Sequence, residues 1–191
     1  MRNSVTLSGQ QTVIDAQQLF ASQQEKEWIE LAKNGDRHAF QQLYQLHIGK
    51  VYGLCLRMLA QRDQAEDVAQ EVFVQVWLKL KNFRGDSKFS TWLHSVATNT
   101  VLSHLRKQKN WMQRMFSIED THISEPTVNE HPELSDLDKT ILKLPEKARL
   151  VFVMFAVEGY RHEEIASMLN MAVGSSKSHY HRAKKLLQEW L

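Results

Sequence analysis

The stretch NMAVGSSKSHYHRAKK, residues 170–185, carries the side chains best suited to chemistry in this chain. If it is a helix, its spacing puts Tyr180, Ala183 and Leu187 on one side. The opposite side then presents basic and hydroxyl-bearing residues, namely Lys177, Ser178, His181, Arg182 and Lys185. Such a face suits phosphates and the base edges of the DNA major groove. The alternative interpretation is the solvated outer face of an ordinary helix pair.

The residues before this helix favour the DNA-binding interpretation, because they have the spacing of a helix-turn-helix. Ala166 is small where two helices would cross closely, and Ile165, Leu169 and Met171 are apolar around it. Asn170 follows Ala166 by four residues, at a turn position that usually needs a positive φ, for which Asn is the best substitute for Gly. The pattern therefore predicts two helices joined at Asn170.

Two residues depart from the usual helix-turn-helix pattern. Arg161 stands where a Ser or Thr cap would pair with Glu164. Ser176 stands where an inward aliphatic residue is usual. These departures predict a first helix that frays and a pair that packs loosely.

The string RHEEIA, residues 161–166, raises the possibility of a zinc enzyme in a chain with nine His. The zinc-protease motif needs a second His four residues after the first, and Ala166 occupies that place. No Gly-rich phosphate loop, activated Ser or paired-carboxylate cleft is apparent, so we do not expect an enzyme, a metal or a cofactor. Several His are interpreted as surface polar residues, namely His122, His131, His162, His179 and His181.

The elements that position these residues are predicted to be helices. With 42% hydrophobic residues, seven Gly and three Pro, the 191-residue chain indicates a soluble all-α protein of one ordinary or two small domains. The net charge of +2 says little about partners. The N-terminus has no secretory h-region, which favours a cytoplasmic location.

Cys55 is the single cysteine, so we expect a small buried hydrophobe and neither a disulfide nor a Cys-based zinc site.

The chain divides into two helical modules. Residues 1–24 form a polar tail, and residues 25–114 form a first module in which Gly35 ends one helix and Asp36 caps the next. Residues 115–133 are predicted to be a flexible acidic linker, since seven acids and no Lys or Arg lie between 115 and 138. Residues 134–191 form a second module whose helix near 145 begins at Pro145.

The third helix of the first module, which begins near Asp63, has two different halves. Its start carries a polar and acidic face, with the early acids near the positive end of the helix dipole. Its end, from Val72 to Leu80, is apolar nearly all the way round, so more than one side must be covered. The polar face consists of Asp63, Glu66, Asp67, Gln70 and Glu71.

Two strings together resemble one protein family. DQAEDVAQEVFVQVWLKLKNFRGDSKFSTWLHSVATNTVLSHLRK resembles region 2 of the sigma-70 family of bacterial RNA polymerase initiation factors. LPEKARLVFVMFAVEGYRHEEIASMLNMAVGSSKSHYHRAKKLL, residues 144–187, resembles region 4. With a short linker between them, the chain looks like the extracytoplasmic-function (ECF) group, and the resemblance covers the chain outside its N-terminal tail.

The resemblance implies partners and site residues. Asp67, Gln70 and Glu71 would contact the β′ clamp of core RNA polymerase, with the β flap as a further contact. The linker would thread through the polymerase toward the nascent RNA. An anti-sigma factor, often membrane-anchored, would hold the factor inactive. Single-stranded −10 DNA would be bound by Phe83, Arg84, Ser87, Asn99, Arg106 and Lys107. The −35 duplex would be read by Lys177, Ser178, His181 and Arg182.

Some of these assignments have alternatives. Phe83 and Asn99 suit a base pocket, yet both also suit a core or capping role, and Trp92 is interpreted as core. The chain departs from the common family pattern at Ser103, Asn170, Ser176 and His179, so the promoter sequence does not follow from any relative. A helix-turn-helix regulator without polymerase would explain the second module but leave the 63–83 helix without a role. A helical adaptor with an incidental basic helix is the other alternative.

Overall fold

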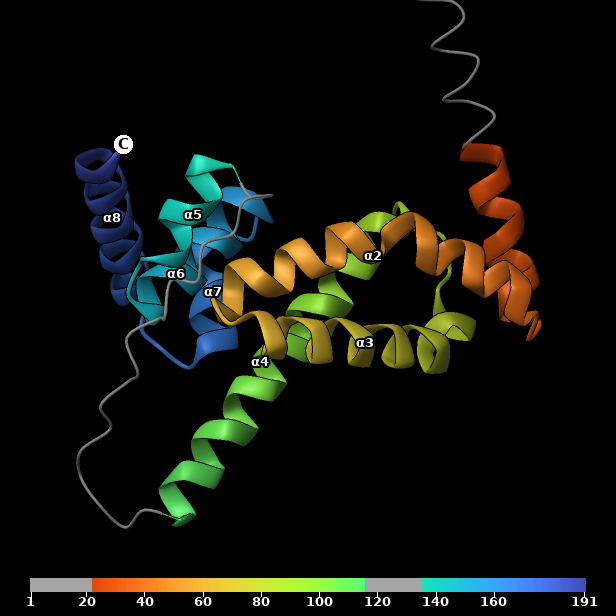
Figure 1. The fold of residues 1–191 in the computed structure, drawn as a ribbon, viewed down its shortest axis with the longest axis horizontal. Helices are drawn as coiled ribbons and strands as arrows, with labels where there is room; N and C mark the ends of the chain where they lie inside the picture. The colour runs from red at the N-terminus through yellow and green to blue at the C-terminus, as the bar shows by residue number, and fades with distance from the viewer. Residues whose placement is uncertain (1–21, 116–134) are drawn as a thin grey trace, which may run out of the picture.

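The computed structural model describes residues 22–115 and 135–191, and the regular structure in these ranges is helical (Figure 1). The predicted all-α class is confirmed. Helix is present from residue 22, three residues before the predicted boundary at 25. The predictions for residues 1–21 and for the acidic linker fall on segments outside the described residues, and the module boundaries stay predictions.

The first helical segment, 22–33, ends as its sequence predicts. Gly35 has a φ of +94°, a conformation that glycine adopts without a steric penalty. Asp36 then caps helix α2, Arg37–Leu59, because its Oδ1 accepts a hydrogen bond from the Ala39 N–H at 3.0 Å. The buried His47 of α2 contacts Glu25 at 2.8 Å, which holds the 22–33 segment against α2.

Helices α2, α3 (Arg62–Lys79) and α4 (Phe89–Met115) form the first module (Figure 1). A short 3-10 turn, Leu80–Asn82, and an exposed loop connect α3 to α4. Cys55 lies in the core between these helices, and burial raises the pKa of its thiol to about 12. The predicted role of Cys55 as a small buried hydrophobe is confirmed. Other buried side chains of this core are Leu43, Val51, Leu54, Met58, Val68, Val72, Val76, Leu93, Ala97 and Val101.

In the second module, residues 135–191 form four α-helices and one π-helical segment. Helix α5 spans Asp136–Leu142, α6 spans Glu146–Phe152, α7 spans His162–Leu169 and α8 spans Val173–Trp190. Pro145 directly precedes α6, as predicted, with a φ of −54°. The π-helical segment Val153–Val157 follows α6, and the Glu158 N–H bonds to Val153 O across five residues. Buried side chains of this module include Leu144, Val151, Met154, Ile165, Ala183 and Leu187.

The two modules are joined by the buried side chain of Arg149. Its guanidinium donates to Met58 O at 3.3 Å and to Leu59 O at 3.5 Å, both at the C-terminal end of α2. The same group donates to Leu142 O at 3.4 Å and Leu144 O at 2.8 Å in its own module. These carbonyls lie at or just after helix C-termini, where backbone acceptors lack helical partners and a cation is favoured by the helix dipole.

An ion pair lies beside this junction. Arg57 Nε of α2 contacts Asp138 Oδ1 of α5 at 2.7 Å. Burial acts to raise the pKa of Asp138, but hydrogen bonds from Arg57 and Ser135 outweigh it and lower that pKa. Helices α5 and α6 therefore pack against the end of α2 in a fixed position (Figure 1).

We predict that Arg149→Ala lowers the free energy of unfolding by about 2–3 kcal/mol, because four carbonyls lose their donor in a buried place. Thermal unfolding followed by circular dichroism measures the change. Arg149→Lys should not restore stability, since an ammonium group cannot reach carbonyls on two modules at once. Arg37→Ala, at an exposed position of α2, is the matched control and should stay within about 0.5 kcal/mol. Equal effects of Arg149→Ala and Arg37→Ala would contradict this role.

Candidate DNA and protein interfaces

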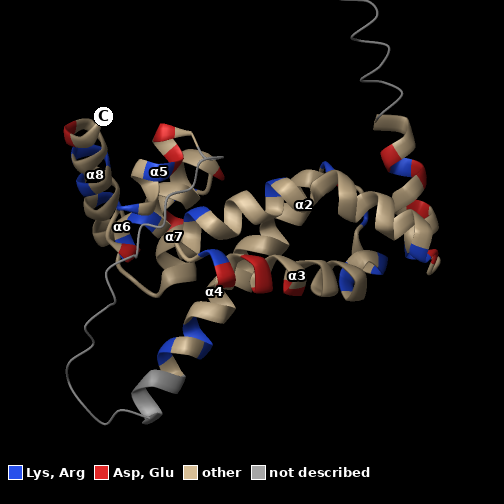
Figure 2. Cartoon of the chain, in the orientation of Figure 1, with Lys and Arg blue, Asp and Glu red and all other residues tan. Residues whose placement is uncertain are grey.

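One face of helix α8 packs against the rest of its module, and the opposite face is exposed to solvent. Ala183 and Leu187 are buried, and Tyr180 packs on Phe152 and Phe155 at centroid distances of 6.0 and 4.6 Å. The opposite face is exposed, and Figure 2 shows Lys and Arg along it. It contains all four residues predicted for −35 DNA, namely Lys177, Ser178, His181 and Arg182. The predicted division of this helix into two faces is confirmed.

The turn between α7 and α8 has the predicted geometry. Asn170 is in the left-handed region, with a φ of +51°. The Met171 N–H bonds to Ala166 O at 2.9 Å and the Asn170 N–H bonds to Ser167 O at 3.4 Å. This pair of bonds is the Schellman pattern that ends a helix, and it fixes the angle at which α8 leaves α7.

The predicted loose packing of this helix pair is wrong, because a polar contact replaces the usual aliphatic one. Ser176 is fully buried, and its hydroxyl lies 2.9 Å from Nδ1 of His162. The His162 ring in turn stacks on Phe155 at a centroid distance of 4.3 Å. The start of α7 is also held, since the Arg161 N–H donates to the Glu164 carboxylate at 2.7 Å. The Glu164 carboxylate therefore holds the start of α7 although no Ser or Thr cap is present at position 161.

The surroundings of α8 are electrostatically positive. His179 has a lowered pKa, first because it is partly buried and then because Lys147 and Arg182 lie near it. Lys147 belongs to α6, so a second helix adds positive charge beside the exposed face. The positive charges of Lys147 and Arg182 favour an approaching phosphate.

Helix α3 presents the predicted acidic face. Asp67 and Gln70 are exposed and Glu71 is half-buried, whereas Ala65, Val68 and other residues of the opposite face are buried. Figure 2 shows acidic residues gathered at the start of α3. The face thus stays available to a protein partner.

An apolar extension of this face was missed in the sequence. Val74 and Leu78 have 57% and 66% of their surface exposed. They follow Asp67 by seven and eleven residues, a spacing that continues the same helix face. The signal was present in the sequence, but the apolar second half of α3 was expected to be covered. We define Asp67, Gln70, Glu71, Val74 and Leu78 as the α3 face.

The residues predicted for −10 DNA are divided in the structure. Phe83 keeps only 8% of its surface exposed and packs against Phe89 and Trp92 at centroid distances of 5.6 and 5.3 Å. Arg84 and Ser87 are exposed in the loop that follows. Phe83 is therefore a buried residue that packs below this loop. The contact with Trp92 agrees with the interpretation of Trp92 as a core residue.

The remaining three residues lie on α4. Asn99 is exposed, and its side-chain amide donates to Ser95 O at 2.8 Å. Lys107 lies 3.9 Å from Glu71 of the α3 face. Arg106 points to the other module, where it donates to Met168 O at 2.6 Å.

Two other properties concern the part of the chain that the structure describes. Within residues 22–115 and 135–191, no group of three or more His, Cys, Asp or Glu side chains is arranged to hold a metal ion. In the same ranges, no helix combines the length and the apolar character needed to cross a membrane.

The chain matches two family models, sigma-70 region 2 over residues 43–110 and sigma-70 region 4 over residues 134–187. It is 33% identical over 179 residues to the ECF RNA polymerase sigma factor SigW of Bacillus subtilis, covering 87% of this chain and 96% of that protein. It is 28% identical over 186 residues to the RNA polymerase sigma-H factor of Pseudomonas aeruginosa, covering 91% and 96%. The chain therefore belongs to the sigma-70 family, in its ECF group.

A solved structure resembles the fold as well. The sigma factor RpoE of Bartonella quintana, crystallised in complex with the anti-sigma factor NepR, matches with a TM-score of 0.53 and 25% identity over 79% of this chain and 95% of that chain. The resemblance stated from the sequence is confirmed. The chain is a bacterial transcription initiation factor that directs core RNA polymerase to promoters, and a regulator acting without polymerase is not favoured.

We predict that Ser176→Ala lowers the free energy of unfolding by about 1 kcal/mol, because Nδ1 of His162 loses its buried partner. Chemical denaturation measures the change. Ser175→Ala is the matched control, since Ser175 is the exposed neighbour on the same helix turn and should be neutral. If the two variants unfold alike, the Ser176–His162 contact does not hold the pair together.

Proposed function

We propose that the exposed face of α8 reads the −35 element. The observation that carries this proposal is the asymmetry of α8, whose apolar side is packed in the module while Lys177, Ser178, His181 and Arg182 are exposed. Lys and Arg suit phosphates and guanine edges, and Ser and His suit further hydrogen bonds to bases. The Schellman turn at Asn170 and the buried Ser176–His162 contact support the proposal, because they give α8 a fixed direction for groove entry.

The α3 face is the proposed contact with the β′ clamp of core polymerase. Asp67, Gln70 and Glu71 supply a negative surface that complements a basic partner, which steers association. Val74 and Leu78 supply exposed apolar area at the other end, and burying this area against a partner contributes favourably to affinity. The β flap is proposed to contact the second module.

The −10 element is proposed to bind around the loop that holds Arg84 and Ser87. Phe83 forms the buried floor of this loop, Asn99 offers an amide to a base edge, and Arg106 and Lys107 offer charge to phosphates. No covalent step is proposed. Strand opening follows from differential binding, because contacts to unstacked bases offset the free energy of unpairing.

An anti-sigma factor is the proposed regulator. The supporting observation is that the chain shares its fold with a sigma factor crystallised in such a complex, RpoE with NepR. The inhibitor is proposed to be membrane-anchored and to act on a factor located in the cytoplasm.

We predict that Arg182→Ala weakens binding of −35 duplex by about five- to a hundredfold, the range for losing one good base or phosphate contact. Fluorescence anisotropy of the polymerase complex on a labelled promoter measures the loss, and co-purification with core polymerase should be unchanged. Arg161→Ala, at an exposed position before α7, is a control for loss of charge alone. Equal weakening by both variants would mean that only bulk charge matters, and loss of polymerase binding would mean that the module unfolds.

We predict that Leu78→Asp weakens binding to core polymerase at least tenfold, because a carboxylate would enter an apolar contact. Competition against a labelled sigma factor for core polymerase measures the affinity. Leu46→Asp, which changes another exposed leucine outside the α3 face and outside the second module, is the matched control. An unchanged affinity for Leu78→Asp would remove the apolar half of the α3 face from the interface.

A further inference from the structure

The 22–33 segment places a cation below the loop proposed for −10 DNA. Nζ of Lys33 lies over the Phe83 ring, 5.5 Å from its centroid. Phe89 and Trp92 of α4 pack on the same ring. A positive group over an aromatic face is attracted by the π electrons of the ring. Lys33 therefore belongs to the surface around Phe83, although it is far from that residue in the sequence.

The backbone that carries Lys33 has a fixed position. Near the start of the segment, the Glu25 carboxylate lies 2.8 Å from Nε2 of His47 on α2. After Lys33, the N–H groups of Gly35 and Asp36 bond back to carbonyls of the segment and close the turn. Lys33 lies in the last helical turn before this point, where the helix dipole favours a cation. The segment is thus held at both ends, and only the Lys33 side chain has to move to meet a ligand.

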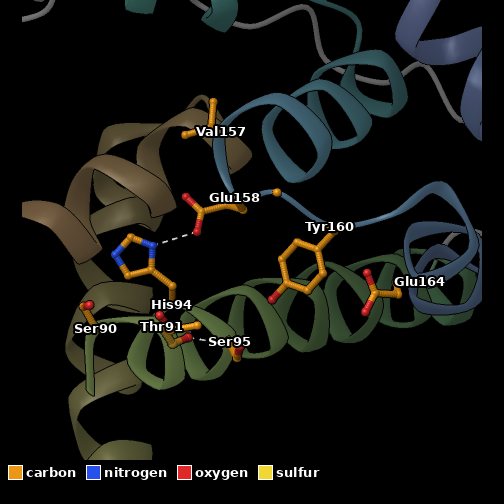
Figure 3. Close-up of a pocket in the computed structure, with 9 residues that line it drawn as sticks. Ser90, Thr91, His94, Ser95, Val157, Glu158, Tyr160 and Glu164 are labelled. Carbon is orange, nitrogen blue, oxygen red and sulfur yellow. Dashed lines mark hydrogen bonds and ion pairs between the residues drawn. The ribbon is translucent and has the colours of Figure 1, made fainter. Parts of the chain in front are cut away.

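The start of α4 separates the aromatic rings from the second module. Asn99 follows Trp92 by seven residues, which is about two helical turns, so the two share one side of α4. His94 follows Trp92 by two residues, and this spacing places it on roughly the opposite side. There Nδ1 of His94 lies 2.7 Å from the Glu158 carboxylate, at an open polar hollow between the modules (Figure 3). The side of α4 that carries Trp92 and the exposed Asn99 lies away from this contact and can receive a DNA strand.

The charge around Phe83 favours a polyanion. Residues 81–88 contain three basic side chains and one acidic side chain, and all four are exposed. The basic residues are Lys81, Arg84 and Lys88, and the acidic residue is Asp86. Lys33 adds a fourth cation from a different part of the chain. Several cations gathered on one surface raise the local concentration of phosphate groups.

In the free protein, Lys33 is paired with Glu30. Its Nζ lies 2.7 Å from Glu30 Oε1, and the Glu30 side chain is 69% exposed, against 20% for Lys33. An ion pair of this kind on a helix surface contributes little to stability, because water and salt screen it. A DNA phosphate can therefore replace the Glu30 carboxylate at the ammonium group with little loss of stability.

We propose that Lys33 is a further contact with single-stranded −10 DNA. Its ammonium group exchanges the Glu30 carboxylate for the backbone phosphate of the nucleotide nearest Phe83. The inference rests on the proposed function, because it takes the loop that holds Arg84 and Ser87 to bind the −10 element. It extends the DNA surface to the 22–33 segment. Because a phosphate is the same at every nucleotide, Lys33 contributes to affinity and not to the choice of sequence.

The salt dependence of DNA binding tests this contact. The probe is a fork-junction DNA whose non-template strand is single-stranded across the −10 element, with the sequence of a promoter recovered by transcription in vitro. Fluorescence anisotropy measures its affinity for holoenzyme, assembled from the full chain and core polymerase, over a range of KCl concentrations. For single strands, each phosphate contact contributes about −0.7 to the slope of the logarithm of the binding constant against the logarithm of the salt concentration.

We predict that Lys33→Met weakens binding about three- to tenfold at low salt and makes the slope less steep by about 0.7. This variant keeps an unbranched side chain on the Phe83 ring but loses the charge. Lys33→Arg should keep the slope of the parent protein. Glu30→Gln should tighten binding by roughly two- to fivefold, because it frees Lys33 and removes a negative charge near the phosphate. A role of Lys33 in packing alone predicts neither the change in slope nor the gain with Glu30→Gln.

Lys26→Met is the matched control, since Lys26 is an exposed lysine of the same segment, and it should change neither the affinity nor the slope. Circular dichroism and co-purification with core polymerase must show that each variant folds and forms holoenzyme. An unchanged slope in Lys33→Met, or an equal change in Lys26→Met, would overturn the inference. Arg84→Ala separates this outcome from failure of the proposed function. If Arg84→Ala weakens binding and Lys33→Met does not, only the Lys33 contact is wrong, whereas if neither weakens binding, the loop is not the −10 site and both proposals are wrong.

Discussion

The arrangement of the two modules depends on one buried cation. Arg149 donates to carbonyls at the end of α2 and to carbonyls that follow α5, so a single planar group serves acceptors from both modules. Burial lowers its pKa to about 10, which still leaves it charged at neutral pH. Among the described residues, no carboxylate is hydrogen-bonded to Arg149. Backbone carbonyls at helix ends accept its hydrogen bonds instead. Because Arg149 fixes the position of α6 on α2, it also fixes the positions of α7 and α8 in the same module.

This constraint connects fold and function. Because α6 and α8 pack together, the docking of α6 on α2 sets where the basic face of α8 points. It also brings Met168 to Arg106 and Glu158 to His94.

Local features of the fold could be predicted from the sequence, since they depend on neighbours in the chain. The Gly35–Asp36 break, the start of α6 after Pro145, the left-handed Asn170 and the two faces of α8 all follow from spacing and backbone preference. The contacts between modules could not, because Arg149 and Met58 are 91 residues apart. Ser176 was misjudged for a related reason, since its partner His162 comes from another helix. The candidate site residues on α3 and α8 have the expected exposure, whereas Phe83 and Arg106 are engaged in contacts that no local pattern indicates.

We propose that this chain alone gives core polymerase its promoter specificity through two separate surfaces. The most direct measurement is transcription in vitro with purified protein, sigma-free bacterial core polymerase and a pool of genomic promoter fragments, followed by sequencing of the RNA 5′ ends. We expect discrete start sites that share two upstream elements and that disappear when the protein is omitted. Absence of such starts, with duplex DNA still bound by the protein without polymerase, would contradict it.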